Sequence, residues 1–198
     1  MVRTGFSAEL DQLRLQVEVM AVRVDQNLER MKDFLATGDV EVAATAVAAD
    51  DDIDAMNLSL TERCYDLLAR ESPVASDLRF VMSVLRVLGE LERVGDLALR
   101  VVKVGDDWSL VRSSASTYDI LVSMAETSVE QFREALRAWS SQDLDLADHL
   151  ARSGPVLDMA NAQLVKELLL LEGPAAVATA LHSLVIGKAL DRIADHSA

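Results

Sequence analysis

The hexapeptide LERVGD at residues 91–96 returns as LDRIAD at residues 190–195, close to the end of the chain. Residues four positions apart share one face of an α-helix, so each copy predicts a helix with two carboxylates on one side. The carboxylates are Glu92 and Asp96 in the first copy and Asp191 and Asp195 in the second. A hexapeptide repeated in this way indicates an internal duplication.

The two halves of the chain follow one plan. Equivalent residues lie 104 positions apart early in each half and 99 positions apart at the hexapeptides, so the second half is shorter between its second and third helices. Three pairs show the correspondence: Asp39 with Asp143, Pro73 with Pro174, and Arg93 with Arg192. A linker containing glycine and serine separates the halves, which we place at residues 1–106 and 113–198.

Helical spacing dominates both halves. Apolar residues recur at steps of three and four through the first long segment, while aromatic residues, glycine and proline are scarce, a composition typical of packed helices. Breaks at glycine, proline and serine predict six long helices, at residues 7–36, 39–70, 76–104, 117–139, 143–171 and from 174 to the end. We therefore expect an all-α protein with two pseudo-symmetric three-helix bundles side by side.

The formal net charge of the chain is −14, which repels nucleic acid and anionic membrane surfaces and favours cations or basic protein partners. Cys64 is the single cysteine, which fits a reducing compartment. The most apolar stretch, residues 173–187, is too short to span a bilayer, and the N-terminal residues lack a signal-peptide pattern. We expect a cytoplasmic protein without a transmembrane segment.

The paired carboxylates lie at the border of an apolar helix face. On a regular helix, Val81, Leu88 and Leu99 point to within about 60° of Glu92 and Asp96. Carboxylates beside apolar surface are costly unless another group compensates them. A cation with oxygen ligands would do so, which predicts metal sites at both pairs, and pairing with arginines is the alternative.

Two further carboxylates, Asp54 and Asp158, recur at matched positions beside an apolar residue. They fall on the predicted second and fifth helices. We expect them to face the third and sixth helices and to add ligands to the candidate metal sites.

An arginine row at seven-residue spacing follows the predicted third helix, at Arg79, Arg86, Arg93 and Arg100. Residues at this spacing form one stripe on a helix. The stripe would either form salt bridges with the acidic second helix or dock an acidic partner. Only Arg192 keeps an arginine in the second half, so the two halves do not share this role equally.

The chain resembles the PhoU family of phosphate-uptake regulators in two segments, SPVASDLRFVMSVLRVLGELERVGDLALRVVKV (residues 72–104) and KALDRIADHSA (residues 188–198). Helix count, duplication and repeat length agree over essentially the whole chain. The resemblance implies two pseudo-symmetric three-helix bundles. It also implies that the two carboxylate pairs bind metal ions, which among family members are iron, zinc, manganese or magnesium.

The resemblance implies a regulatory role as well. PhoU-like proteins link the phosphate ABC transporter, with its ATPase, to a PhoR-type sensor histidine kinase, so that the regulon is repressed when phosphate is plentiful. They also restrain the transporter, and any association with the membrane is expected to be peripheral, through these partners. The chain departs from the family pattern at Asp191, where Glu is common, and at Ala194, where Gly is common.

Two other functions are compatible with the pattern. A metal-dependent enzyme would need an open coordination position and a partner acid or base, and the sequence shows no nucleophile–base constellation or glycine-rich phosphate loop. A structural dimerisation bundle would use the carboxylates only to pair with arginines. A non-enzymatic adaptor is the leading interpretation, and the exposed apolar arc would permit it to form a homodimer.

Overall fold

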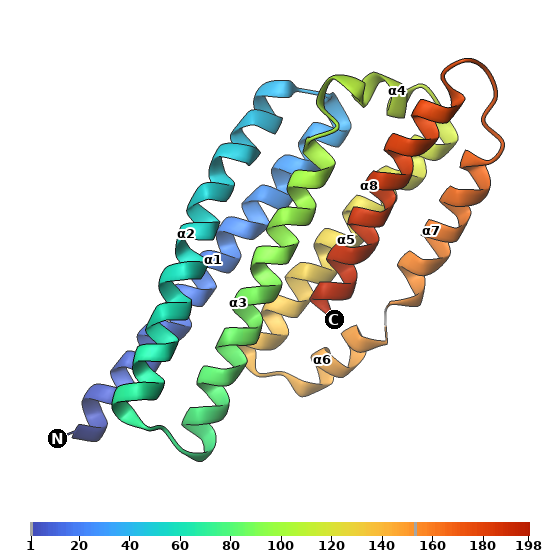
Figure 1. Cartoon of the computed structure of the whole chain (residues 1–198). Helices are drawn as coiled ribbons and strands as arrows, with labels where there is room; N and C mark the ends of the chain where they lie inside the picture. Colours follow the sequence, from blue (N-terminus) through green and yellow to red (C-terminus); the bar gives the residue numbers. More distant parts are fainter. Residues whose placement is uncertain (1, 153) are drawn as a thin grey trace.

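The computed structural model describes residues 2–152 and 154–198, and all regular structure in these residues is helical (Figure 1). The elements, in chain order, are α1 (Val2–Thr37), α2 (Val40–Glu71), α3 (Ala75–Val102), the 3-10 turn η1 (Gly105–Asp107), α4 (Trp108–Arg112), α5 (Ala115–Ser141), α6 (Leu144–Ala151), α7 (Pro155–Leu168) and α8 (Ala176–Ser197). None of the described helices combines the length and the apolar character needed to cross a bilayer. The predicted all-α class is confirmed.

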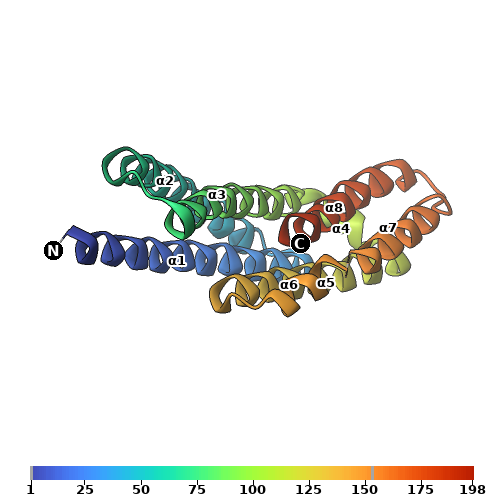
Figure 2. The same cartoon turned by 90° about the horizontal axis from the view of Figure 1, so that it is seen from below.

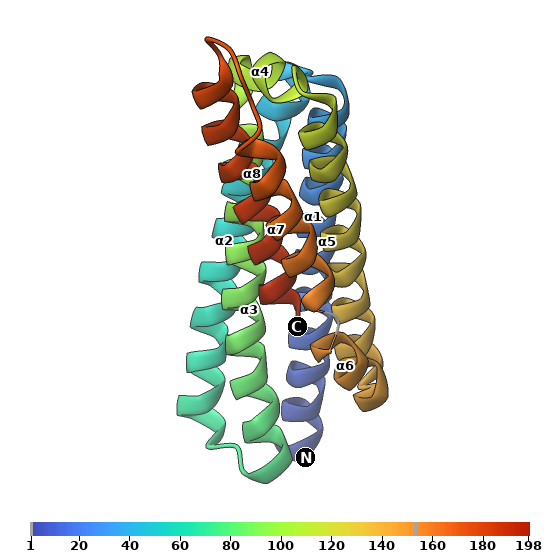
Figure 3. The same ribbon diagram turned by 90° about the vertical axis from the view of Figure 1, so that its right-hand side faces the viewer.

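The helices form two three-helix bundles. The first bundle contains α1, α2 and α3, and the second contains α5, the α6–α7 pair and α8. The bundles join where α3 packs along α8 and α1 along α5, which gives an elongated molecule (Figure 2). Figure 3 shows the second bundle from its own side, with α7 and α8 in front of the first bundle. The predicted duplication is confirmed.

A single apolar core runs through both bundles. It consists mainly of aliphatic and methionine side chains, and its fully buried members include Leu28 of α1, Leu67 of α2, Leu88 of α3, Met124 of α5 and Ile186 of α8. Each such side chain contributes roughly 1.5–3 kcal/mol by leaving water. The core therefore fixes the rotation of α3 and α8 about their axes, and with it the direction of their carboxylates.

The turn between α1 and α2 is built as the sequence predicts. Gly38 has a φ of 71°, and Asp39 caps α2 by accepting the Glu41 N–H at 2.8 Å. A Cβ atom at Gly38 would lie 2.4 Å from the ring of Trp108. Glycine is thus required both for the positive φ and for the approach of the tryptophan.

The predicted fifth helix, residues 143–171, is wrong in one respect, because the structure divides it into α6 and α7. Asp143 lies at the predicted start and caps α6 by accepting the Leu146 N–H, but α6 ends at Ala151 and α7 begins at Pro155. Proline has no N–H to donate to the carbonyl four residues earlier, and its ring clashes with that carbonyl. Pro155 therefore prevents a continuous helix through Ala151.

The predicted linker between the halves is partly helical and is attached to the first bundle. It contains η1 and α4, and the indole N–H of Trp108 donates to the Leu35 carbonyl at 2.9 Å. Arg112 lies over the Trp108 ring, 5.3 Å from its centre. The hydrogen bond holds α4 against the end of α1.

Candidate functional site

Each hexapeptide lies on a helix at the junction of the two bundles, the first on α3 and the second on α8. Their apolar residues enter the core: Leu91, Val94, Leu190 and Ile193. Of the carboxylates, Asp191 is buried, Glu92 is half-buried, and Asp96 and Asp195 are exposed. The pairs thus lie at the border of the apolar face, as helix geometry predicts.

The first hexapeptide belongs to a larger group of acids, which we call the α2–α3 acidic cluster: Asp50, Asp54, Glu92 and Asp96. Burial, followed by the negative charges of Asp54 and Asp96, raises the pKa of Asp50 to about 6. Burial, followed by the charges of Asp96 and Asp54, also raises the pKa of Glu92. Lys103 and Arg93 offset these effects only in part, so the cluster concentrates negative charge.

Asp50 is the most enclosed member of the α2–α3 acidic cluster. It is only 8% exposed, and it has no hydrogen bond or ion pair with any residue in the described ranges 2–152 and 154–198. Its Oδ1 would lie 3.3 Å from a Cβ atom placed on Gly95. The glycine of LERVGD therefore leaves the room on α3 that Asp50 of α2 occupies.

Asp191, the buried carboxylate of the second bundle, has direct partners. Lys188 Nζ lies 3.0 Å from Oδ2 of Asp191, and Asn161 Nδ2 donates to the same oxygen at 3.3 Å. Asn161 is itself buried, and its Oδ1 has no hydrogen-bond partner among the described residues. Asp191 is thus compensated by a lysine and an amide, whereas the first bundle has no comparable pairing.

In neither bundle do the described acids form a complete set of metal ligands. Among the described residues, no three His, Cys, Asp or Glu side chains come close enough together to hold a metal ion. The concentrated negative charge of the α2–α3 acidic cluster fits a bound cation, because a cation would offset the repulsion among its members. The second pair fits one less well, because Lys188 already supplies the positive charge. Asp158 is exposed on α7, and no contact between it and Asp191 is seen.

A second feature opens where the two hexapeptides meet. A hollow of about 410 Å³ lies between α3 and α8, and we call it the arginine groove. It is lined by Arg93, Asp96, Leu97 and Arg100 of α3 and by Arg192, Asp195 and His196 of α8. Both exposed acids of the hexapeptides thus share one groove with three arginines.

The arginine row of α3 is exposed along its whole length, at Arg79, Arg86, Arg93 and Arg100. In the part of the chain that the structure describes, these side chains and Arg192 form no ion pair with any acid. The salt bridges with α2 that the sequence allowed are therefore not formed. Guanidinium groups held at the surface without partners remain available to an anionic ligand or an acidic protein surface.

The family model of the PhoU domain matches this chain twice, over residues 17–104 and 121–198. The chain belongs to the PhoU family. It is 29% identical over 195 residues to the phosphate-specific transport system accessory protein PhoU of Serratia marcescens, covering 96% of this chain and 79% of that protein. The accessory protein PhoU of Escherichia coli is 27% identical with the same coverage.

Solved PhoU structures share this fold. The crystal structure of PhoU from Pseudomonas aeruginosa matches with a TM-score of 0.91 at 29% identity, covering 97% of this chain and 93% of that one. PhoU from Streptococcus pneumoniae matches with a TM-score of 0.85 at 24% identity, covering 97% and 91%. The two matched domains of this PhoU-family chain fall one in each predicted half.

Sequence reasoning missed three residues of the candidate site: Asp50, Asn161 and Lys188. For Asp50, a comparison of the two halves of the chain would have indicated its position. Where the first half pairs Asp50 with Gly95, the equivalent positions of the second half hold Gly154 and Ala194. A methyl group therefore appears on α8 where the facing acid has been lost, and this exchange points to a contact.

Proposed function

We propose that this chain is a cytoplasmic, non-enzymatic adaptor that restrains phosphate uptake and represses phosphate-starvation signalling. Its partners would be the ATPase of a phosphate ABC transporter and a PhoR-type sensor histidine kinase. The observation that supports this most directly is the match to PhoU along nearly the entire chain in sequence and fold. Relatives of the chain are named as accessory proteins of the phosphate-specific transport system.

The arginine groove and the exposed arginine row are the surface we assign to an acidic partner. Their guanidinium groups have no acidic partner in the described part of the chain, and arginine forms two-pronged hydrogen bonds with carboxylates. The net charge of the chain is −14, so the chain as a whole repels an acidic partner. A local cluster of arginines would attract that partner to one face and so fix its orientation. Membrane association would then be peripheral, through the transporter.

Metal binding belongs to the same proposal. Glu92 and Asp96, together with Asp54 and the buried Asp50, would hold iron, zinc, manganese or magnesium in the first bundle. Asp191 and Asp195, with Asp158 of α7 as a further candidate ligand, would form a weaker second site. Bound cations would offset the repulsion within the α2–α3 acidic cluster and so stabilise the packing of α2 on α3.

Deletion of the gene, with a phosphate-starvation reporter measured in phosphate-rich medium, tests the adaptor role. We expect the deletion to raise reporter expression and the wild-type gene to restore repression. A variant with Arg93→Ala, Arg100→Ala and Arg192→Ala should fail to restore it. Arg152→Ala is the matched control, because Arg152 is an exposed arginine outside the groove.

Unchanged reporter expression after deletion would refute the adaptor proposal. Full repression by the triple variant, at normal protein abundance, would leave the adaptor role but remove the arginine groove from it.

A further inference from the structure

The exposed side of α8 changes its chemistry halfway along the helix. Figure 2 shows α3 and α8 in one layer of the molecule and α1 and α5 in the other, so this side of α8 faces away from α5. Its second half presents Lys188, Arg192 and Asp195. Its first half presents only apolar side chains, which we call the α8 apolar stripe: Val177 (72% exposed), Leu181 (59%), Leu184 (37%) and Val185 (45%).

The α8 apolar stripe and the arginine groove lie on one continuous face. At 100° per residue, Leu181 and Val185 point to within about 20° of Arg192, which lines the groove. Residues 176–187 contain no Asp, Glu, Lys or Arg, and the half-buried His182 places its Nε2 3.4 Å from Oδ2 of Asp107. The stripe is therefore uncharged up to the point where the basic end begins.

The duplication shows that this apolar surface is particular to α8. The arginine row of α3 includes Arg79 and Arg86, and the equivalent positions of α8 are Ala178 and Val185. α8 thus carries apolar side chains where α3 carries arginines, on the side that continues into the arginine groove. Contiguous exposed apolar residues rimmed by polar ones mark interaction sites in soluble proteins.

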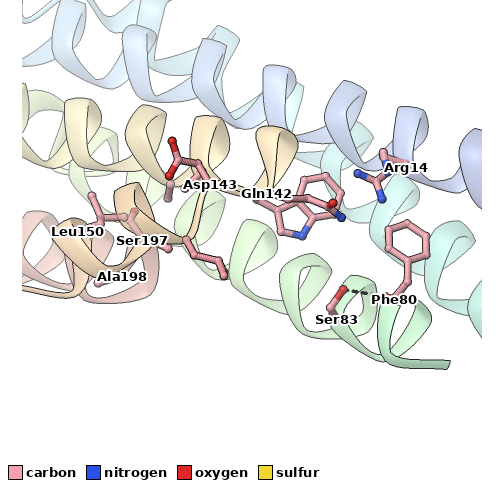
Figure 4. Close-up of a pocket in the computed structure, with 13 residues that line it drawn as sticks. Arg14, Phe80, Ser83, Gln142, Asp143, Leu150, Ser197 and Ala198 are labelled. Atoms are coloured by element: carbon pink, nitrogen blue, oxygen red, sulfur yellow. Dashed lines mark hydrogen bonds between the residues drawn. The ribbon is translucent and has the colours of Figure 1, made fainter. Parts of the chain in front are cut away.

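A hollow of about 610 Å³ at the other end of α8 selects a partner less clearly. Arg14 and Asp143 both line it, so its charges balance. Arg14 also lies over the Phe80 ring, 4.9 Å from its centre (Figure 4). In the arginine groove, by contrast, three arginines outnumber two acids and form no ion pair with a described residue. The face shared by the stripe and the groove is therefore the one whose chemistry specifies a partner.

We propose that this face docks one amphipathic helix of the acidic partner, with aliphatic side chains over the α8 apolar stripe and Asp or Glu over the arginine groove. The proposal rests on the adaptor role and adds the chemistry of the partner segment. Apolar burial would supply affinity, and the carboxylate–arginine pairs would fix the direction in which the helix lies. The face from Val177 to Arg192 is about 22 Å long, which matches a helix of about 15 residues.

Binding of this chain to the purified ATPase of the transporter and to the cytoplasmic part of the sensor kinase, both from the same organism, tests the proposal. Leu181→Glu with Val185→Glu should weaken binding to one of them by about tenfold or more. Leu15→Glu with Val19→Glu is the matched control and should leave binding unchanged. Leu15 and Val19 have the same spacing on α1, are 57% and 45% exposed, and lie outside the groove.

Val185→Arg separates the proposed helix from a partner surface that is acidic throughout. It introduces the side chain that α3 carries at the equivalent position, Arg86. An apolar contact at Val185 predicts binding about tenfold weaker, whereas an acidic contact there would make binding tighter. Peptides tiled along the bound partner should then compete only where aliphatic residues at helical spacing adjoin acids.

Circular dichroism establishes that each variant is folded before binding is measured. If neither purified protein binds the wild-type chain, this proposal fails together with the adaptor role. Binding that Leu181→Glu/Val185→Glu leaves unchanged, or that Val185→Arg strengthens, overturns the helix proposal and leaves the adaptor role standing. The helix proposal is also overturned if the double variant instead abolishes a dimer in sedimentation, or binding to vesicles of phosphatidylethanolamine and phosphatidylglycerol. The stripe would then serve a second copy of the chain or a membrane.

Discussion

Nζ of Lys188 lies 3.0 Å from Oδ2 of Asp191, so the second hexapeptide carries its own positive counter-charge. The equivalent position in the first bundle is Gly89, and Glu92 there has no ion pair with a described residue. The duplication has therefore kept the carboxylate spacing and changed the electrostatics. A cation should gain more from binding the first bundle than the second.

The first prediction concerns this difference between the bundles. Glu92→Gln with Asp96→Asn should remove the more tightly bound metal ion, because it removes two of the four repelling acids of the α2–α3 acidic cluster. Asp191→Asn with Asp195→Asn should leave that ion in place. Metal content by mass spectrometry, after incubation with manganese or iron and exchange into metal-free buffer, gives the comparison. Equal losses in the two double variants would contradict the asymmetry.

The second prediction concerns Lys188 itself. Lys188→Met removes the positive charge beside Asp191 while keeping much of the aliphatic stem, so the affinity of the second bundle for a divalent cation should rise by about tenfold. Titration calorimetry with manganese on chelator-treated protein measures it. Lys166→Met on α7, which removes an exposed lysine that has no ion pair with a described residue, should leave the affinity unchanged. An unchanged affinity in Lys188→Met would mean that Asp191 does not ligate metal.

The fold was readable from local patterns. Apolar spacing located the helices, Asp39 and Asp143 marked two helix starts that the structure confirms, and the repeated hexapeptide revealed the duplication. Pro155 was equally readable, since a proline inside a helical pattern interrupts it. The predicted continuous fifth helix was wrong because apolar residues keep helical spacing on both sides of Pro155, and that spacing is insensitive to the missing N–H.

The candidate site was only partly readable. The directions of Glu92 and Asp96 follow from helix geometry alone, and so does the contact of Lys188 with Asp191, which lies three residues along the same helix. The membership of Asp50 depends on how α2 is aligned along α3, which packing across the whole bundle determines. No local pattern predicts that alignment. The difference between Gly95 and its equivalent in the second half, Ala194, is consistent with it.

The third prediction is a pH dependence that originates at Asp50. The pKa of this carboxyl is about 6 in the folded chain, above its ordinary value of 3.8. Between these values the folded state holds a proton that the unfolded state has released, so stability falls as pH rises through this window and stays reduced above it. Asp50→Asn should therefore raise the free energy of unfolding at pH 7 by on the order of 1 kcal/mol, with little effect near pH 4.

Thermal unfolding at both pH values, with a chelator present, makes this comparison. Asp51→Asn is the control, because Asp51 is exposed beside Asp50 and should change stability little at either pH. Stabilisation by Asp50→Asn that is the same at pH 4 and pH 7 would show that titration is not its origin.

The fourth prediction is that Gly95 and Asp50 are energetically coupled. A Cβ atom added at Gly95 would lie 3.3 Å from Asp50 Oδ1. The stability that Gly95→Ala gains from higher helix propensity should therefore be offset by crowding of the carboxylate. In the Asp50→Ala background the crowding is absent, and Gly95→Ala should stabilise by roughly 0.5–1 kcal/mol. A double-mutant cycle from chemical denaturation measures the coupling, expected to be on the order of 0.5–1 kcal/mol. Additive effects would show that the carboxylate moves aside freely.

The last prediction concerns the turn that positions the linker. Gly38→Ala must place a Cβ atom at a φ of 71° and 2.4 Å from the Trp108 ring. The left-handed backbone alone costs about 1–2 kcal/mol for a residue with a side chain, and displacing Trp108 would also break its hydrogen bond to the Leu35 carbonyl. We therefore expect a loss of about 2 kcal/mol or more in the free energy of unfolding, measured by chemical denaturation.

A second variant, Gly89→Ala, separates the effect at Gly38 from a general effect of replacing glycine. Gly89 is helical and an added Cβ atom meets nothing within 4 Å, so this change should stabilise by roughly 0.5–1 kcal/mol. A shift of stability in the same direction for both variants would contradict a specific requirement for glycine at position 38.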